Sequence, residues 1–413
     1  MRIAVVIFIA GLLGVGIFIP GDVSMALQEN EMKAIPSYAS FADIQAAKNC
    51  FIIVGDTQGT SHWEFWRERN DRERKLIIDE ITRREPAFVI HLGDLTTRGS
   101  SEKHWQEFDD MHKEFRKKKI PYFPILGNHE LYGSDRKALK NYFERFPHLH
   151  QRRWYSFTWN NVAMVMVDSN FSALTKRQIK EQSHWYLNEL EKFEKKVEID
   201  FIIVCCHEPP FTNNRVVGPN EEAKLSFADP FLRFQKACLF FSGHSHSYER
   251  FQMDGKFFVV SGGGGGPRHK VIVDPRKQHY QDLFSGPELR FFHFCEIGSR
   301  NDTLVFRIIH LDSDETFTVA DPLIISKIRR WAYYPVRQPK NFSGRLFVFR
   351  FESTQICRVS PSAITSSCSL RRISYPKVII RLLTPFSRVR TITVSSYRAE
   401  FRYRQLTSDT TSL

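Results

Sequence analysis

The chain has 413 residues, enough for two or three domains and for a large hydrophobic core. Hydrophobic residues make up 42% of it and charged residues 25%, an ordinary composition that indicates a globular protein. The net charge of +13 does not indicate a nucleic-acid-binding body, because residues 326–413 hold 17 Lys and Arg against three acidic residues, whereas the preceding residues hold 42 basic and 43 acidic ones.

The N-terminus has the pattern of a targeting segment. Arg2 precedes an apolar run over residues 3–19, and Pro20-Gly21 ends it. This order is typical of a signal peptide, and Ser24 and Ala26 supply the small residues of a cleavage site. Because 17 apolar residues lie at the low edge of a membrane span, an uncleaved anchor is the alternative. We therefore expect residues 1–26 to be a signal peptide or N-terminal anchor and the protein to be exported, either periplasmic or secreted.

The next part of the chain alternates short apolar strands with amphipathic helices. Strands are predicted at 50–54, 87–92, 120–126, 162–167, 201–206, 239–242 and 256–260, and helices at 70–84, 100–119, 135–146 and 175–196. Segments 291–297 and 303–311 resemble a closing antiparallel pair. Alternating strands and helices indicate an α/β fold with largely parallel pairing, and we expect one catalytic domain over residues 45–320.

The sequence changes character after about residue 321. Helical periodicity disappears, acidic residues become rare, and alternation at 345–351 and 390–403 fits strands. We treat residues 321–413 as a basic tail with three open interpretations: a small accessory β domain, a disordered segment, or sequence never selected to fold, such as the product of a shifted reading frame. If the tail has a partner, its charge favours a polyanion or an anionic membrane.

Five predicted strands end in side chains that can bind metal ions. In open α/β sheets, the carboxyl ends of the strands converge on one crevice. The six side chains offer oxygen and nitrogen but no thiolate, which suits Mn, Fe or Zn, and a carboxylate can bridge two such ions. The candidate ligands are Asp56, Asp94, Asn128, His207, His244 and His246.

Five blocks within residues 50–270 resemble the sequence blocks of the calcineurin-like metallophosphoesterases. They are Gly55-Asp56-Thr57-Gln58, Gly93-Asp94, Gly127-Asn128-His129-Glu130, Val204-Cys205-Cys206-His207 and Gly243-His244-Ser245-His246. The last block, continued through Ser247-Tyr248-Glu249-Arg250, is most similar to the purple acid phosphatase branch. The resemblance implies a four-layer α/β/β/α sandwich of two mixed sheets around a dinuclear metal centre.

The resemblance also implies roles for these residues. One metal ion would be held by Asp56, Asp94 and His246, and the other by Asn128, His207, His244 and the bridging Asp94. His129 would contact the phosphate and assist the leaving group. The expected activity is hydrolysis of a phosphomonoester or phosphodiester by attack of a metal-bridging hydroxide.

Two positions depart from the pattern. Gln58 stands where the first block commonly has His, and Thr97 stands where purple acid phosphatases carry Tyr. Thr97 offers no phenolate, so we expect an ordinary pair of divalent ions rather than a tyrosinate-bound ferric ion. The alternative function is a catalytically impaired module on the same scaffold that binds phosphate or polyanions.

Two neighbouring features have expectations of their own. Glu130 is expected either to orient His129 or simply to begin a helix. The run Gly262–Gly266 lacks the Lys-Ser/Thr of a P-loop, so we interpret it as a close approach of the backbone to the site.

Overall fold

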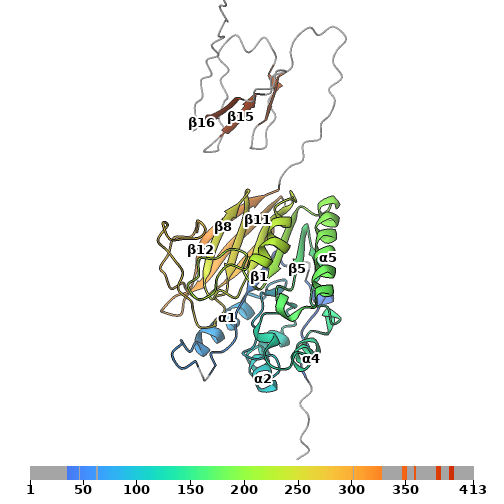
Figure 1. The fold of residues 1–413 in the computed structure, drawn as a ribbon, viewed down its shortest axis with the longest axis vertical. Coiled ribbons are helices and arrows are strands. Elements are labelled where there is room, and N and C mark those ends of the chain that lie inside the picture. Colours follow the sequence, from blue (N-terminus) through green and yellow to red (C-terminus); the bar gives the residue numbers. More distant parts are fainter. Residues whose placement is uncertain are drawn as a thin grey trace, which may run out of the picture. The chain divides into compact units, whose positions relative to one another are not determined.

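The computed structural model describes residues 35–45, 47–61, 64–300 and 302–327, together with the backbone of four short strands between 347 and 394 (Figure 1). The chain divides into two compact units, Met1–Arg329 and Arg330–Leu413. The predicted signal peptide or anchor, residues 1–26, lies outside the described residues. Within the described part of the chain, no helix is long and apolar enough to span a membrane.

The first unit contains two six-stranded mixed sheets. The first sheet has the order β12-β11-β10-β1-β2-β3, with parallel pairing only among β1, β2 and β3. Its strands are β1 (Cys50–Val54), β2 (Val89–His91), β3 (Tyr122–Pro124), β10 (His293–Arg300), β11 (Thr303–Leu311) and β12 (Phe317–Ser326). The expected closing pair is present as β10 and β11, and β12 adds a third antiparallel strand.

The second sheet has the order β4-β5-β6-β7-β9-β8. Strands β5, β6, β7 and β9 pair in parallel, whereas β4 and β8 pair antiparallel at the two edges. Its strands are β4 (Tyr155–Trp159), β5 (Val162–Met166), β6 (Phe201–Cys206), β7 (Ala237–Ser242), β8 (Tyr248–Met253) and β9 (Lys256–Ser261). Across both sheets, the pairing is more mixed than the alternation of strands and helices predicted.

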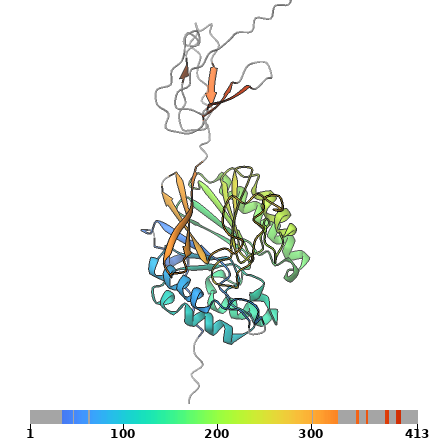
Figure 2. The same ribbon diagram turned by 90° about the vertical axis from the view of Figure 1, so that its left-hand side faces the viewer.

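Helices cover the two sheets (Figures 1 and 2). The longer ones are α1 (Asp71–Arg84), α2 (Glu102–Met111), α4 (Asp135–Arg145) and α5 (Lys176–Lys195). The helix predicted at 100–119 is two helices, because the backbone at His112 leaves helical geometry between α2 and α3 (Lys113–Lys117). Short elements complete the unit: η1 (Phe41–Asp43), η2 (His129–Leu131), η3 (Pro147–Leu149), η4 (Phe171–Ala173), α6 (Glu221–Ala223), η5 (Lys224–Ala228) and α7 (Asp229–Phe231).

Side-chain alternation along the second sheet creates the layers. In β5, Met164 faces the core shared with the first sheet, whereas Val165 faces the core beneath α5. Successive side chains of a strand point to opposite faces, so a strand buried on both faces reads as one continuous apolar run. Trp105 of α2 and Tyr142 of α4 pack into the core of the first sheet. The predicted four-layer α/β/β/α sandwich is confirmed.

The proposed boundary at residue 321 falls inside β12, which continues to Ser326. The Asp321-Pro322 pair resembles a break in the sequence, but an edge strand tolerates Pro because one side of it needs no ladder hydrogen bond. Asp321 accepts hydrogen bonds from the Arg250 guanidinium, at 2.7 Å, and from the Tyr248 hydroxyl, at 2.6 Å. Strand β12 is therefore attached to the end of the His244 block.

The second unit contains an antiparallel sheet of the order β14-β13-β15-β16. Its strands are β13 (Phe347–Arg350), β14 (Arg358–Val359), β15 (Val378–Leu382) and β16 (Arg390–Val394). Two of them lie in the segments where alternation predicted strands. Contact of this basic segment with a polyanion or membrane stays a prediction.

Candidate metal centre

The strand ends bring the predicted ligands together. Asp56 follows β1, Asp94 follows β2, His207 follows β6, and the loop between β7 and β8 carries His244 and His246. Two groups have potential ligand atoms that all lie within 4.8 Å of one another: Asp56, Asp94 and His246 form one, and Asp94, His207 and His244 form the other. Asp94 belongs to both groups, as expected of a bridging carboxylate.

Asn128 joins the second group. Its Oδ1 lies 3.0 Å from Nε2 of His207, which is 3.4 Å from Oδ1 of Asp94. In the first group, Nε2 of His246 lies 3.4 Å from Oδ1 of Asp56. Each half of the centre therefore presents imidazole nitrogen and carboxylate oxygen towards one point.

Backbone carbonyls fix the orientation of three imidazoles. Nδ1 of His207 bonds to the Leu92 carbonyl, and Nδ1 of His246 bonds to the Pro267 carbonyl, both at 2.8 Å. Nδ1 of His129 bonds in the same way to the Thr97 carbonyl at 2.8 Å. A carbonyl can only accept, so each Nδ1 carries the proton, and Nε2 is the atom turned towards the carboxylates.

Three of the site residues have a left-handed backbone. The φ angles of Asp56, Asp94 and His244 are 61°, 58° and 63°. This conformation is unfavourable for residues with a Cβ and is concentrated at functional sites. The sharp turns let these side chains leave the strand ends and face the centre.

Glycines allow the surrounding backbone to approach the two carboxylates. A Cβ at Gly127 would lie 2.2 Å from Oδ1 of Asp94, and one at Gly262 would lie 2.9 Å from Oδ2 of Asp56. A Cβ at Gly266 would lie 2.9 Å from the His246 ring. The interpretation of the glycine run as a close approach of the backbone is confirmed.

The ionisable groups show that the centre attracts positive charge. Burial opposes the ionisation of Asp94, but neighbouring histidines, His207 above all, outweigh it and lower the pKa of Asp94. Burial also opposes a proton on His207, yet the Asp94 carboxylate raises the pKa of His207 to about 10. Burial and the charge of His207 lower the pKa of His244 to about 3. The Asp94 carboxylate thus stabilises the protonated form of the His207 imidazole, and a metal ion that binds there must displace that proton.

Glu130 lies in the first turn of the short helix η2, in line with one of its two expected roles, but it does not orient His129. Its Oε2 accepts hydrogen bonds from the backbone N–H groups of Asp94 and Gly127, at 2.7 and 2.8 Å, and its Oε1 accepts from Leu95 and Thr96. The expectation that it orients His129 was wrong, because the side chain points inward from η2 and binds the Asp94 loop instead. Burial, together with the Asp94 carboxylate, raises the pKa of Glu130, and the hydrogen bonds from the Gly127 and Thr96 N–H groups oppose that rise.

Two further side chains lie against His246. Nε2 of Gln58 donates to Oδ2 of Asp94 at 3.1 Å and lies 3.0 Å from Nε2 of His246. His269, which the sequence did not single out, stacks on the His246 ring with centroids 4.4 Å apart and planes inclined by 11°. His269 follows the glycine run, and its spacing from the run matches no motif. Its position beside His246 is therefore visible only in the folded structure.

The departure at Thr97 leaves no phenol at that position. Its hydroxyl donates to the Gly59 carbonyl at 3.0 Å. The nearby phenol belongs to Tyr132, whose hydroxyl accepts from the Asn128 amide at 2.7 Å and whose ring packs 4.5 Å from His129. Tyr132 therefore contacts Asn128 and His129 and restricts the orientation of both side chains.

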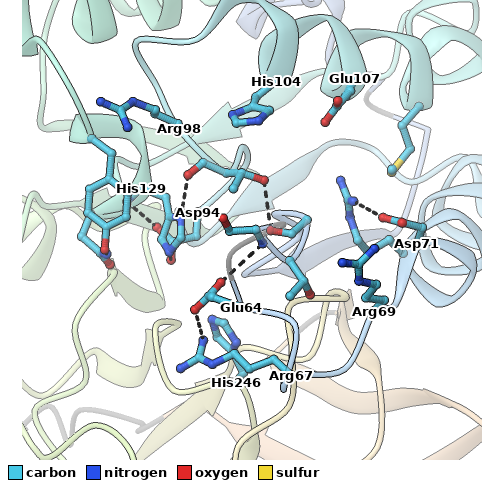
Figure 3. Close-up of a pocket in the computed structure, with 18 of the residues that line it drawn as sticks. Glu64, Arg67, Arg69, Asp71, Asp94, Arg98, His104, Glu107, His129 and His246 are labelled. Atoms are coloured by element: carbon cyan, nitrogen blue, oxygen red, sulfur yellow. Dashed lines mark hydrogen bonds and ion pairs between the residues drawn. The ribbon is translucent and has the colours of Figure 1, made fainter.

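The centre opens into a pocket of about 1000 Å³ (Figure 3). Its lining includes Asp94, Asn128, His129, His244 and His246, and it continues along α2, residues 59–61 and 64–69, and the first turns of α1. The candidate metal centre is thus accessible to a ligand larger than a phosphate ion.

Comparison with known proteins assigns this arrangement to a class. Residues 51–248 match the family model of calcineurin-like phosphoesterases. The chain therefore carries a calcineurin-like phosphoesterase domain, in agreement with the sequence blocks and the two-sheet fold.

The curated relatives include purple acid phosphatases. Purple acid phosphatase 21 of Arabidopsis thaliana is 25% identical over 290 residues, which cover 66% of this chain and 62% of the relative. Purple acid phosphatase 1 of Ipomoea batatas is 28% identical over 213 residues, covering 48% and 42%. Tartrate-resistant acid phosphatase type 5 of Mus musculus is 24% identical over 268 residues, covering 60% and 79%. The chain spans less than two thirds of the length of the first two.

A solved structure shares the fold. The purple acid phosphatase PPD1 from yellow lupin (Lupinus luteus) seeds superposes with a TM-score of 0.50 at 17% identity, covering 68% of this chain and 54% of that chain. At this identity the similarity concerns the fold alone.

Proposed function

We propose that this chain is a dinuclear metal-dependent phosphoesterase that hydrolyses a phosphomonoester or phosphodiester. The observation that carries the proposal is the pair of carboxylate and histidine groups that share Asp94. One divalent ion would be held by Asp56, Asp94 and His246, and the other by Asp94 together with Asn128, His207 and His244.

The donor set fits two divalent ions. It contains carboxylates, an amide oxygen and imidazoles but no thiolate, which suits Mn, Fe or Zn. The fixed Nδ1–H bonds of His207 and His246 leave Nε2 available as a ligand atom. Oε1 of Gln58 is buried and has no hydrogen-bond partner among the described residues. A buried acceptor of this kind normally binds a donor or a cation, and this one lies beside the group formed by Asp56, Asp94 and His246.

The protein's own residues supply orientation and a proton. Two divalent ions, when bound, would supply electrostatic stabilisation of the phosphoryl group and would lower the pKa of a water molecule. His129 lines the pocket, and its Nε2 lies 3.9 Å from Oδ2 of Asp94, on the substrate side of the centre. Because Nδ1 is held by the Thr97 carbonyl, Nε2 can protonate a leaving oxygen only when the ring carries both protons.

The alternative is an impaired module that binds phosphate. One observation favours it: the Gln58 amide nitrogen contacts both Asp94 and His246, where the first ion would be held. An amide that kept this orientation would oppose a cation at that half of the centre.

A metal-dependent assay distinguishes the two functions. The protein is stripped with a chelator, supplied with Mn²⁺, Fe²⁺ or Zn²⁺, and assayed with an aryl phosphate and the matching bis-aryl diester. We expect metal-dependent release of the phenol, and we expect Asp94→Asn to abolish it and to lower the bound metal towards one ion or none.

Asp135→Asn provides the matched control. Asp135 is exposed at the start of α4 and does not line the pocket, so the same change of charge there should leave rate and metal content unaltered. Phosphate binding without hydrolysis under any metal would favour the impaired module. Asp94→Asn with a normal rate and two bound ions would show that the assignment of Asp94 is wrong.

A further inference from the structure

We propose that the pocket contains a second anion-binding subsite, formed by Arg69 and Arg74, and that the preferred substrate therefore carries a second anionic group besides the ester that is hydrolysed. This inference rests on the proposed function, because it places the ester at the candidate metal centre. It extends that function by naming the class of substrate.

The pocket is larger than a single phosphate requires. Its volume of about 1000 Å³ lies at the upper end of ligand pockets in general. Asp94 and His129 lie on one side of it, and Arg69 and Asp71 lie on the opposite side (Figure 3). A substrate whose ester occupies the metal centre therefore extends its leaving group towards the start of α1.

Arg74 places a buried positive charge at that end of the pocket. Its side chain is only 8% exposed, and it donates to the Thr57 carbonyl at 2.7 Å and to Oδ1 of Asp71 at 2.8 Å. Asp71 is 81% exposed, so much of its charge is screened by water. Burial lowers the pKa of Arg74, while Asp71 and, to a smaller extent, Glu107 oppose the change. A buried guanidinium with a largely hydrated partner gains from a further anion.

Arg69 adds a second guanidinium that no acid neutralises. It lines the pocket and has no hydrogen-bond or ion-pair partner among the residues that the structure describes. Two other basic residues of this lining are already paired: Arg67 with Glu64 at 3.2 Å, and Lys75 with Asp79 at 2.5 Å. The guanidinium group is planar and binds phosphate or carboxylate through two parallel hydrogen bonds.

The opposite wall is less suited to an anion. Lys103 of α2 lines the pocket and also lacks a partner among the described residues, but α2 places Glu107 and Asp110 along the same wall. Both carboxylates line the pocket with Lys103, and Glu107 also interacts electrostatically with Arg74. The structure thus assigns the second anion to the Arg69 and Arg74 side.

Matched substrates test the subsite. The full chain, loaded with metal, is assayed for phosphate release from hexanediol bisphosphate, phosphohexanoate and hexyl phosphate. These differ only in carrying a phosphate, a carboxylate or no charge at the far end. We expect the highest kcat/KM for a substrate with a charged end, and the bisphosphate and carboxylate arms identify which anion is preferred.

Two substitutions should act in opposite directions. Arg69→Gln should lower the ratio of kcat/KM for the preferred substrate with a charged far end to kcat/KM for hexyl phosphate by about threefold to tenfold. An exposed charge pair contributes little binding free energy, and a charge-assisted hydrogen bond contributes more. Asp71→Asn removes a competing carboxylate beside Arg74 and should raise the same ratio. Both effects should lie mainly in KM, because the subsite binds the leaving group rather than the reacting atoms.

Two controls separate the subsite from general charge effects. Arg72→Gln removes an exposed arginine that pairs with Glu315 and does not line the pocket, and Lys103→Gln removes a charge from the opposite wall. Neither should change the ratio. The proposal would be overturned if Lys103→Gln changed the ratio of kcat/KM values and Arg69→Gln did not. It would also be overturned if all three substrates had equal kcat/KM.

Failure of the subsite can be distinguished from failure of the proposed function. Absence of hydrolysis with every substrate would contradict the proposed function alone. Calorimetric titration with hexane bisphosphonate, which cannot be hydrolysed, then tests the subsite directly. Weaker binding by Arg69→Gln but not by Arg72→Gln supports the subsite, and equal binding by both variants overturns it.

Discussion

Replacing Gly127 by Ala tests whether activity depends on the position of Asp94. The new Cβ would lie 2.2 Å from Oδ1 and 2.4 Å from the backbone nitrogen of Asp94. Normal contacts of this kind are about 3.5 Å, so one of the two loops must move by about 1 Å. Overpacking of this kind costs about 1–3 kcal/mol of stability, and a displacement of this size at a reacting group can lower the rate by about 10²-fold.

Gly218→Ala is the matched control. A Cβ at Gly218 would meet no heavy atom within 4 Å, and neither glycine has a positive φ, so the same methyl group adds no backbone strain at either position. The variants are compared by urea unfolding, by elemental analysis of bound metal and by kcat/KM on an aryl phosphate. Gly127→Ala with two bound ions and a rate within a factor of two of the control would refute the argument that this contact positions Asp94.

Three further outcomes are expected. His129→Ala should lower kcat by about 10²–10⁴-fold with both ions retained, and by less for an aryl phosphate with a very acidic leaving group; equal losses would indicate phosphate positioning instead. Burial raises the pKa of Glu249 to about 7, although the hydrogen bonds from Thr212 and Asn213 oppose the rise. The folded state therefore binds the proton more tightly than the unfolded chain does, and the free energy of unfolding falls as the pH rises from about 4.5 to 7. Glu249→Gln should flatten that decline in urea midpoints, and an unchanged slope would contradict it. A chain ending after Arg329 keeps all of β12 and loses the basic segment, so it should stay active and no longer bind heparin or anionic vesicles; insolubility would show that the segment completes the fold.

The convergence of the candidate ligands was predictable because their signal is local. Asp94 follows an apolar strand and a glycine, and parallel strands place their carboxyl ends at one edge of a sheet. The direction in which neighbouring strands pair was harder to predict from the residue patterns. Strands β8 and β9 form an antiparallel hairpin at an edge, yet their composition resembles that of the parallel strands beside them. Composition responds to burial, whereas pairing direction depends on the path of the whole chain.

The residues that contact the candidate ligands from other parts of the chain carry no local signal. His269 reaches His246 only because a hairpin and a run of glycines return the backbone to the site. Glu130 adjoins His129 in sequence, which suggested a contact between them, but its side chain points to the other side of η2. Residues one position apart face different directions in a short helical turn, so adjacency in sequence does not predict contact.

Gln58 determines whether the first half of the centre can hold an ion. Its amide nitrogen donates to Oδ2 of Asp94, while its buried Oε1 lacks a partner among the described residues. A cation beside Asp56, Asp94 and His246 would repel the NH₂ group. Rotation of the amide by half a turn would direct Oε1 to the cation and remove both the repulsion and the unsatisfied acceptor. The arrangement that favours an impaired module is therefore reversible.

Two nearly isosteric substitutions test this rotation. Gln58→Leu removes the oxygen and should weaken binding of one of the two ions by about 10–100-fold, the range for lost supporting interactions at metal sites. Gln58→Glu supplies a charged oxygen at the same place and should strengthen binding of that ion. Chelator competition followed by elemental analysis measures both affinities. If Gln58→Leu binds both ions as tightly as the unsubstituted chain, Gln58 is not a ligand, and three protein side chains suffice at that half of the centre.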